Sequence, residues 1–378
     1  MKFQVSLLMT AVAIVAVGCG QSSDVVKIGH VGPVSGAIAH LGKDNENGAR
    51  MAIDELNEKG ITIGGKKVKF ELVAEDDAAD PKQGTAAAQK LVDSKVNGVI
   101  GHLNSGTTIP ASKLYSDAGI PQISPSATNP KYTRQGFKTA FRVVADDTQL
   151  GSTLGKYAVT ELKGKSIAVI DDRTAYGQGV AEEFEKAVKA AGGNVVGREF
   201  TTDKATDFTA ILTTLKGKSP DIIFFGGMDA VAGPMIKQMK SLGINAKFMG
   251  GDGICTGALY KLSGETMADD QVICAEAGGV DEAGKKALDD FKAAYQKKFN
   301  TKVEIYAPYV YDAVNTMVSA MQAANSTKPA DYLPKLATIT HQGVTGTIAF
   351  DEKGDIKNGA LTLRTYRGGN PVDLAVVR

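Results

Sequence analysis

The sequence predicts an α/β protein with two doubly wound lobes, each built on a parallel sheet and joined to the other by a hinge of several strands. Short apolar runs rich in β-branched residues alternate with amphipathic helical segments, which is typical of parallel sheets covered by helices. This pattern starts anew after residues 141–143, and the 378-residue chain is longer than one hydrophobic core usually fills. No Pro- or Ser-rich linker separates the halves, so we expect strands to join them.

The first residues have the pattern of a secretion signal. Lys2 is followed by an apolar run over residues 5–17, too short for the roughly 20 residues of a membrane-spanning helix. We therefore assign residues 1–18 to a signal peptide and expect a periplasmic or otherwise extracytoplasmic protein. Ala16-Val17-Gly18-Cys19 is similar to a bacterial lipobox, although Ala16 replaces the usual leucine, so we favour a lipid anchor on Cys19. Ordinary cleavage after a small-x-small pattern is the alternative, and the lipid would be the only link to a membrane.

The first lobe is predicted from strand and helix patterns that follow each other closely. After a strand at residues 25–31, Ala49, Ala52, Ile53 and Leu56 recur at i, i+3, i+4 and i+7 of a helix. That helix should end at Gly60, and the next should begin with Asp80 as its cap and Pro81 in its first turn. The other predicted elements are strands at 67–73, 96–100 and 120–123 and a helix at 108–117.

The second half repeats the same alternation. Helices are predicted at 148–162, 180–191, 208–215 and 231–242, and strands at 166–170, 195–200, 221–225 and 247–249. Two long helices at 282–299 and 306–324 precede a strand at 346–350, a turn at 351–355 and a closing strand at 360–365. We expect residues 24–145 and 277–348 to form the N-terminal lobe, and residues 146–276 and 349–378 the C-terminal lobe.

Composition and motifs favour a binding protein without enzymatic activity. The net charge of +1, the pI near 7.6 and the lack of a basic cluster argue against a nucleic-acid partner. Gly164-Lys165-Ser166 and Gly217-Lys218-Ser219 lack the first glycine of a phosphate-binding loop, and Glu182 stands where a dinucleotide fingerprint needs its third glycine. The four histidines have no spacing that suggests a metal site or a catalytic triad. We expect no cofactor and no metal.

Cys255 and Cys274 are the cysteines that remain beyond Cys19. An even pair in an exported chain favours a disulfide over a zinc site, which would need more ligands nearby. Two free buried thiols are the alternative.

Two polar segments follow neighbouring predicted strands. Residues 101–112 lead from a strand into a helix, whose free N–H groups and dipole suit a carboxylate. Residues 123–130 leave the adjacent strand at the same sheet edge, where doubly wound sheets form ligand crevices. Such a crevice could hold the carboxylate end of a zwitterion. The other end of a zwitterion would need an anion from elsewhere in the protein, since both charges must be compensated when the ligand loses its water.

These segments, with four others, closely resemble the branched-chain amino-acid-binding proteins of ABC transporters, which have the periplasmic binding protein type 1 fold. The four others are residues 76–83, 176–179, 248–253 and 351–355, and the likeness runs in order through essentially the whole mature chain. The resemblance implies a monomeric receptor that closes around free leucine, isoleucine or valine and delivers it to permease subunits.

The resemblance also implies which residues meet the ligand. Its carboxylate is expected at Ser105, Thr128 and Ser126, and Tyr176 should reach it from the other lobe on closure. Its ammonium group is expected at the Ser126 carbonyl, at Thr128 and at Asp252. The other expected ligand residues, around the side-chain pocket, are Leu41, Leu103, Met228 and Tyr306. Simple helix capping is the alternative role for Ser105 and Thr128.

The sequence departs from this family at positions that bear on the ligand. Leu41 and Met228 stand where relatives often carry aromatic residues, and Asp252 stands where they carry a longer glutamate. Ala79 and Asn104 replace a cysteine pair, so that disulfide cannot form. A receptor for another small amino acid or amide is therefore an alternative. So is a sensory module that presents its ligand to a regulator or kinase, whereas a flavodoxin-like enzyme lacks the expected phosphate fingerprint.

Overall fold

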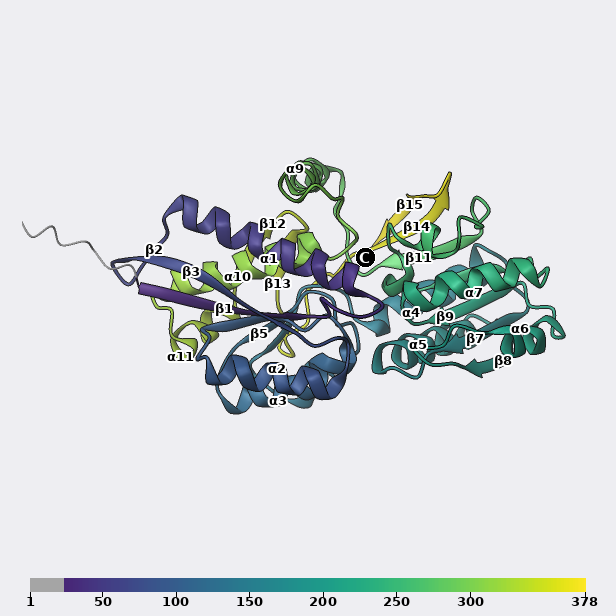
Figure 1. The fold of residues 1–378 in the computed structure, drawn as a ribbon, viewed down its shortest axis with the longest axis horizontal. Helices are drawn as coiled ribbons and strands as arrows, with labels where there is room; N and C mark the ends of the chain where they lie inside the picture. The colour runs from purple at the N-terminus through teal and green to yellow at the C-terminus, as the bar shows by residue number, and fades with distance from the viewer. Residues whose placement is uncertain (1–23) are drawn as a thin grey trace, which may run out of the picture.

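The computed structural model describes residues 24–378 as two α/β lobes that lie side by side along the long axis of the molecule (Figure 1). The predicted α/β class with parallel-sheet lobes is confirmed. The predicted signal peptide and Cys19 lie outside the described residues.

The first sheet contains six strands, most of them parallel. Their order is β2 (Thr62–Ile63), β3 (Lys66–Asp76), β1 (Asp24–Gly32), β4 (Gly98–Gly101), β5 (Gln122–Ser124) and β6 (Ala140–Arg142). β2 pairs antiparallel with β3 in a hairpin, and the other neighbours pair in parallel. The helices that pack together on one face are α1 (Ala39–Lys59) and α10 (Ala307–Ala324), and those on the other are α2 (Pro81–Asp93) and α3 (Ser105–Asp117) (Figure 1).

The second sheet contains seven strands. Their order is β15 (Asn370–Val377), β14 (Leu361–Arg367), β11 (Val272–Glu276), β10 (Lys247–Gly250), β9 (Ile222–Gly226), β7 (Ile167–Asp171) and β8 (Val195–Phe200). The strands from β8 to β11 pair in parallel, whereas β14 and β15 run antiparallel. In both sheets the strand order reverses beside the first strand of the lobe, between β1 and β4 and between β7 and β9, and ligands bind at such reversals.

Alternate residues of the central strands of this second sheet pack into different cores. Ile167 and Val169 of β7 contact the core beneath α4 (Asp147–Thr160) and α5 (Ala175–Ala190). Ala168 and Ile170 contact the core beneath α6 (Thr209–Lys216) and α7 (Asp229–Ser241). The short α8 (Leu259–Leu262) packs on α7. Buried on both faces, β7 reads as the continuous apolar run that parallel strands require.

Local signals set two helix ends as predicted. The Asp80 side chain accepts hydrogen bonds from the backbone N–H groups of Lys82 and Gln83 at the start of α2. Gly60 ends α1 with φ at 67°, a left-handed conformation that glycine adopts without a steric penalty.

Other predicted boundaries were wrong. Helix α5 begins at Ala175 and not near residue 180, because Thr174 caps it by accepting from the N–H of Gly177, so Tyr176 lies in its first turn. β14 is not the closing strand, because β15 follows it and pairs with it. β15 is mostly exposed and has no buried apolar run that would reveal it. Elements missed altogether include β6, β11, α8, α11 (Pro329–Leu336) and β12 (Thr340–Gly343), whereas α9 (Glu282–Phe299) and β13 (Gly346–Ala349) fall close to their predicted ranges.

The chain passes between the lobes at several adjacent segments. The N–H of Ala145 donates to the carbonyl of Ala277 at 3.0 Å, and the Thr362 hydroxyl donates to the carbonyl of Gly278 at 2.8 Å. We call residues 143–145, 277–280 and 356–360 the crossing segments. They line a cavity of about 790 Å³. Within residues 24–378, none of the helices combines the length and the apolar character that a membrane span requires.

Candidate functional site

Side chains from both lobes meet at the carboxylate of Asp252. The Tyr176 hydroxyl, from the start of α5, donates to Asp252 Oδ1 at 2.8 Å, and the Tyr306 hydroxyl, at the start of α10 in the other lobe, donates to Oδ2 at 2.9 Å. Asp252 is 1% exposed. Burial raises the pKa of Asp252 to about 6, although both hydroxyls favour the ionised form. A carboxylate with this environment can still accept hydrogen bonds from an ammonium group on its remaining lone pairs.

Two of these contacts differ from what the family resemblance implies. A tyrosine hydroxyl has one hydrogen, and Tyr176 uses it on Asp252 while accepting from the N–H of Gly253 at 2.9 Å. In this arrangement Tyr176 does not donate to a ligand carboxylate. Tyr306 was expected only as an aromatic wall, but its hydroxyl also binds Asp252.

The facing rim comes from α3 and from the loop after β5. The Ser105 hydroxyl oxygen accepts from the N–H of Asn129 at 3.2 Å, and the Ser126 hydroxyl donates to the carbonyl of Leu103 at 3.0 Å. Thr128 Oγ1 is buried and faces the Asp147 carboxyl group, without a well-formed hydrogen bond among residues 24–378. The helix-capping alternative for Ser105 and Thr128 was wrong, because the N-cap of α3 is Asn104 and that of α4 is Asp146.

The apolar residues predicted for the pocket lie in a single buried cluster. Leu41, Leu103 and Tyr306, from the first lobe, belong to the same cluster as the core beneath α7, and the partly buried Met228 packs against it. A cavity of about 520 Å³ opens between the lobes, and of the predicted ligand residues Tyr176 and Met228 line it. The rest of its lining includes small residues on both sides, such as Gly36, Ala79 and Ala230.

Asp147 is a candidate ligand residue that sequence reasoning missed. It is fully buried beside Thr128, whose hydroxyl favours the ionised form of the carboxyl group, but neither carboxylate oxygen makes a well-formed hydrogen bond in the part of the chain that the structure describes. Burial raises its pKa well above the usual range, and the nearby charge of Asp252 adds to the effect. The sequence did contain one indication of this residue, the pair Asp146-Asp147 at the start of a helix. Asp146 alone caps the helix, so the second aspartate is left for another role.

Two further contacts join the lobes around this site. Nε2 of His40 in α1 lies 2.8 Å from Asp229 Oδ2 at the start of α7, and Asp229 also accepts from the Thr256 hydroxyl at 2.7 Å. Burial alone lowers the pKa of His40, but the hydrogen bond to Asp229 and the negative charges of Asp229 and other nearby carboxylates together outweigh burial and raise that pKa. On the other side, the Asn129 amide donates to the carbonyl of Ala175 at 2.6 Å. The two rims are thus in direct contact, as in a closed cleft.

The chain matches known proteins over most of its length. The family model described as "periplasmic binding protein" matches residues 25–370. The chain belongs to the periplasmic binding protein family. It is 34% identical over 361 residues to a leucine-, isoleucine-, valine-, threonine- and alanine-binding protein of Pseudomonas aeruginosa, with 95% of each chain covered.

Two solved structures of binding proteins share the fold over nearly the whole chain. A leucine-binding protein from Thermotoga maritima is 25% identical with a TM-score of 0.85, covering 93% of this chain and 98% of its own. A branched-chain amino-acid transporter substrate-binding protein from Streptococcus pneumoniae, in complex with isoleucine, is 28% identical with a TM-score of 0.84, covering 93% and 99%. All three relatives are named as proteins that bind amino acids or a transporter's substrate.

In this periplasmic binding protein, a buried ion pair organises the loop that carries Ser126 and Thr128. Arg142 is fully buried, and its Nη1 donates to the carbonyls of Ala127 and Asn129 at 2.9 and 3.0 Å. Its Nε donates to Asp355 Oδ1 at 3.0 Å. The Asp355 carboxylate thus neutralises the charge of Arg142, and Arg142 in turn holds the loop through its carbonyl groups.

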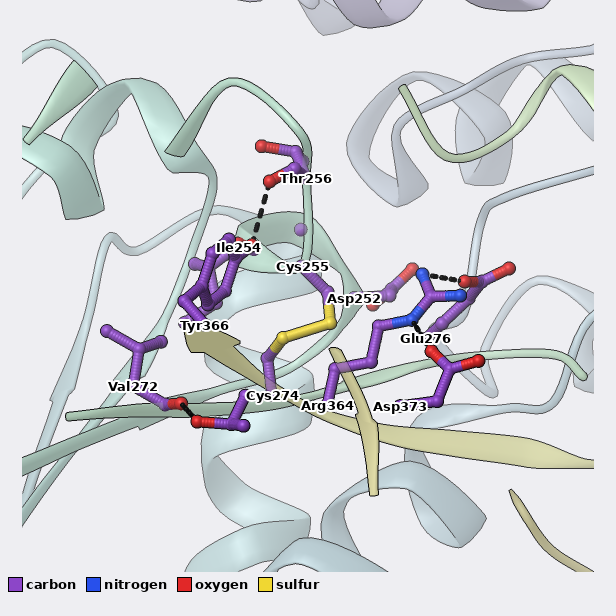
Figure 2. The surroundings of a disulfide bond; sticks show 12 residues. Asp252, Ile254, Cys255, Thr256, Val272, Cys274, Glu276, Arg364, Tyr366 and Asp373 are labelled. Carbon is purple, nitrogen blue, oxygen red and sulfur yellow. Dashed lines mark hydrogen bonds and ion pairs between the residues drawn. A yellow bond between two sulfur atoms is a disulfide. The ribbon is translucent and has the colours of Figure 1, made fainter. Parts of the chain in front are cut away.

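The two cysteines of the C-terminal lobe are joined. Cys255 and Cys274 form a disulfide with their Cα atoms 5.5 Å apart (Figure 2). Cys255 lies three residues after Asp252, so the disulfide lies close to the site in sequence as well as in space. Within the described residues, no group of three or more His, Cys, Asp or Glu side chains is placed to hold a metal ion.

Proposed function

We propose that this periplasmic binding protein captures a free amino acid, with leucine, isoleucine and valine as first candidates, and delivers it to the permease of an ABC transporter. The observation that supports this most directly is the buried Asp252 carboxylate, which tyrosine hydroxyls from both lobes contact. A buried anion opposite a helix N-terminus suits a zwitterion. We further propose a monomer on the extracytoplasmic side, with Cys19 as its lipid anchor.

In this proposal the ligand's two charges are recognised by opposite rims. The carboxylate binds at the N-terminus of α3, where the hydroxyls of Ser105 and Thr128 join the first backbone N–H groups of the helix. The ammonium group binds between Thr128 and the carboxylates of Asp252 and Asp147. The side chain then extends past Leu103 and Tyr306 toward Leu41 and Met228, which supports an aliphatic ligand.

Closure would bring the rims together by rotation of two units. We propose residues 24–145 with 277–348 as one unit and residues 146–276 with 349–378 as the other, hinged at the crossing segments. The hydrogen bonds from His40 to Asp229 and from Asn129 to Ala175 would then form on closure.

A thermal-shift screen tests the function as a whole. A ligand that binds only the folded protein stabilises it by an amount set by its affinity and concentration. Leucine, isoleucine or valine is expected to raise the unfolding temperature in a panel that also holds the other amino acids, γ-aminobutyrate and small amides. A shift with an amide alone would correct the ligand class, and no shift with any compound would contradict the proposal. Copurification with a membrane kinase in place of a permease would favour the sensory alternative.

Ser105→Ala is expected to weaken leucine binding by about 2 kcal/mol, because the ligand carboxylate loses a buried donor. Isothermal titration measures the change. Ser112→Ala is the control, since Ser112 lies on the same helix and its buried hydroxyl donates to the carbonyl of Ile109 at 2.7 Å. Equal affinities of the Ser105 and Ser112 variants would remove Ser105 from the site.

Asp147→Asn is expected to weaken leucine binding roughly tenfold while it raises the unfolding free energy of the ligand-free protein by about 1 kcal/mol. Removing a buried carboxyl group whose oxygens lack well-formed hydrogen bonds relieves a desolvation penalty that Thr128 and Arg142 offset only in part. Titration and urea unfolding measure the two quantities.

Asp146→Ala is the matched control for Asp147. Asp146 caps α4 by accepting from the N–H of Gln149, so its loss should lower stability by about 1 kcal/mol and leave affinity unchanged. If both variants lose stability and neither loses affinity, Asp147 has no part in binding.

A further inference from the structure

Asp252 begins a single 3-10 helical turn, Asp252–Ile254, and has a glycine on each side. The turn follows β10, and Asp252 stands between Gly251 and Gly253. Both glycines are needed for close packing: a Cβ on Gly251 would lie 2.6 Å from the Tyr176 hydroxyl oxygen, and one on Gly253 would lie 2.7 Å from Met228 Sδ. Glycine has the largest backbone freedom of any residue. The two glycines that close packing requires therefore also leave the backbone on either side of Asp252 less restricted than other residues would.

Contacts on the C-terminal side of the turn restrain it. Cys255 is joined by the disulfide to Cys274 in β11, and the Tyr366 hydroxyl in β14 lies 2.7 Å from the carbonyl oxygen of Thr256 and 3.2 Å from that of Ile254 (Figure 2). The side chains of both cysteines and of Tyr366 are buried. Since β11 and β14 are paired strands, these restraints arise from one piece of sheet.

We propose that the Cys255–Cys274 disulfide and the Tyr366 hydroxyl are positioning groups for Asp252. They hold the residues that directly follow the glycine-flanked aspartate, so the carboxylate keeps its place before the ligand arrives. Without them, ordering of the turn would oppose binding, because conformational freedom lost on association weakens affinity. This inference rests on the proposed function, since it assigns the residues a role in ammonium recognition.

The test is a double-mutant cycle with leucine as the probe. Tyr366→Phe and the pair Cys255→Ser with Cys274→Ser are each made in the native chain and in the Asp252→Asn chain, and isothermal titration gives the affinities. In the native background each is expected to weaken leucine binding roughly three- to tenfold. In the Asp252→Asn background each should change it by less than about twofold, because the positioned carboxylate is gone. A role confined to overall stability would not depend on Asp252.

Thr365→Val is the matched control. Thr365 precedes Tyr366 on β14, and its buried hydroxyl also donates to a backbone carbonyl, that of Val272 at 2.9 Å, but this carbonyl lies in β11 and not in the turn. It is expected to change leucine affinity by less than about twofold in both backgrounds. Should the double cysteine variant fail to fold, Tyr366→Phe decides alone.

The outcomes separate this inference from the proposed function. Wild-type protein that binds leucine while the Tyr366 and cysteine variants bind it equally well overturns the positioning role and leaves the receptor intact. Equal losses with and without Asp252 also overturn it. Wild-type protein that binds no amino acid overturns the proposed function, and the positioning role with it.

Discussion

Asp252→Asn is expected to weaken leucine binding by about 3 kcal/mol, roughly a hundredfold, when measured by isothermal titration at neutral pH. The substitution keeps the size of the side chain but removes its negative charge. A buried ammonium group that loses its counter-charge retains its desolvation penalty, which is why such truncations cost about 2–5 kcal/mol. In addition, one end of the asparagine amide is a donor, so it cannot accept from both the Tyr176 and Tyr306 hydroxyls as the carboxylate does.

The same residue should make binding depend on pH. The pKa of Asp252 is raised to about 6 by burial, and its ionised form is the one that binds an ammonium group. The contribution of Asp252 to leucine affinity should therefore be constant above this value and fall as the pH drops below it, toward a limit of about tenfold per pH unit. Asp147, whose pKa burial also raises, should add a separate pH dependence of its own. In Asp252→Asn the component of the pH dependence near 6 should be lost.

Asp312→Asn is the control for both measurements. Asp312 lies on α10, is fully buried, and has a pKa that burial also raises to about 6, but it accepts from the N–H groups of Val344 and Thr345 and not from site residues. It should change stability and leave both the affinity and its pH dependence as in the wild type. A component near pH 6 that persists in Asp252→Asn would assign that titration to another group.

Features of the fold that have a local cause could be predicted from the sequence. Asp80 and Gly60 mark helix ends through hydrogen bonds and backbone conformations within a few residues. The polar loops at Ser105 and Thr128 could be placed at one sheet edge because they follow strands predicted to be neighbours, and β4 and β5 do pair.

Features that arise from packing between distant segments were not visible in this way. Asp147 matters because it is buried where α5 approaches it at Gly179, and nothing near Asp147 in the sequence reports that approach. The bond between Tyr306 and Asp252 joins residues 54 positions apart in different lobes. The family resemblance identified both residues but could not show that their side chains bind each other.

Asp355→Ala is expected to lower the free energy of unfolding by about 3–5 kcal/mol, because it leaves the guanidinium of Arg142 buried without its counter-charge. Burial alone would raise the pKa of Asp355, but the nearby guanidinium outweighs it and holds that pKa below its usual range. The stabilisation is therefore present above the unfolded-state pKa of about 3.9 and is lost as the pH falls through the lower folded-state value. Urea unfolding at pH 7 measures the loss of stability. In an acid titration, the Asp355→Ala variant should unfold at a higher pH than the wild type.

Adding Arg142→Met to Asp355→Ala separates the stability of this pair from its effect on binding. With the buried charge removed, much of the lost stability should return, since a buried ion pair can often be replaced by apolar groups at little net cost. Leucine affinity should not return, because the carbonyls of Ala127 and Asn129 lose the donor that fixes the loop around Thr128. Urea unfolding and titration of the double variant test the two statements. Recovery of affinity together with stability would show that the loop keeps its shape without Arg142, and the ion pair would then serve the fold alone.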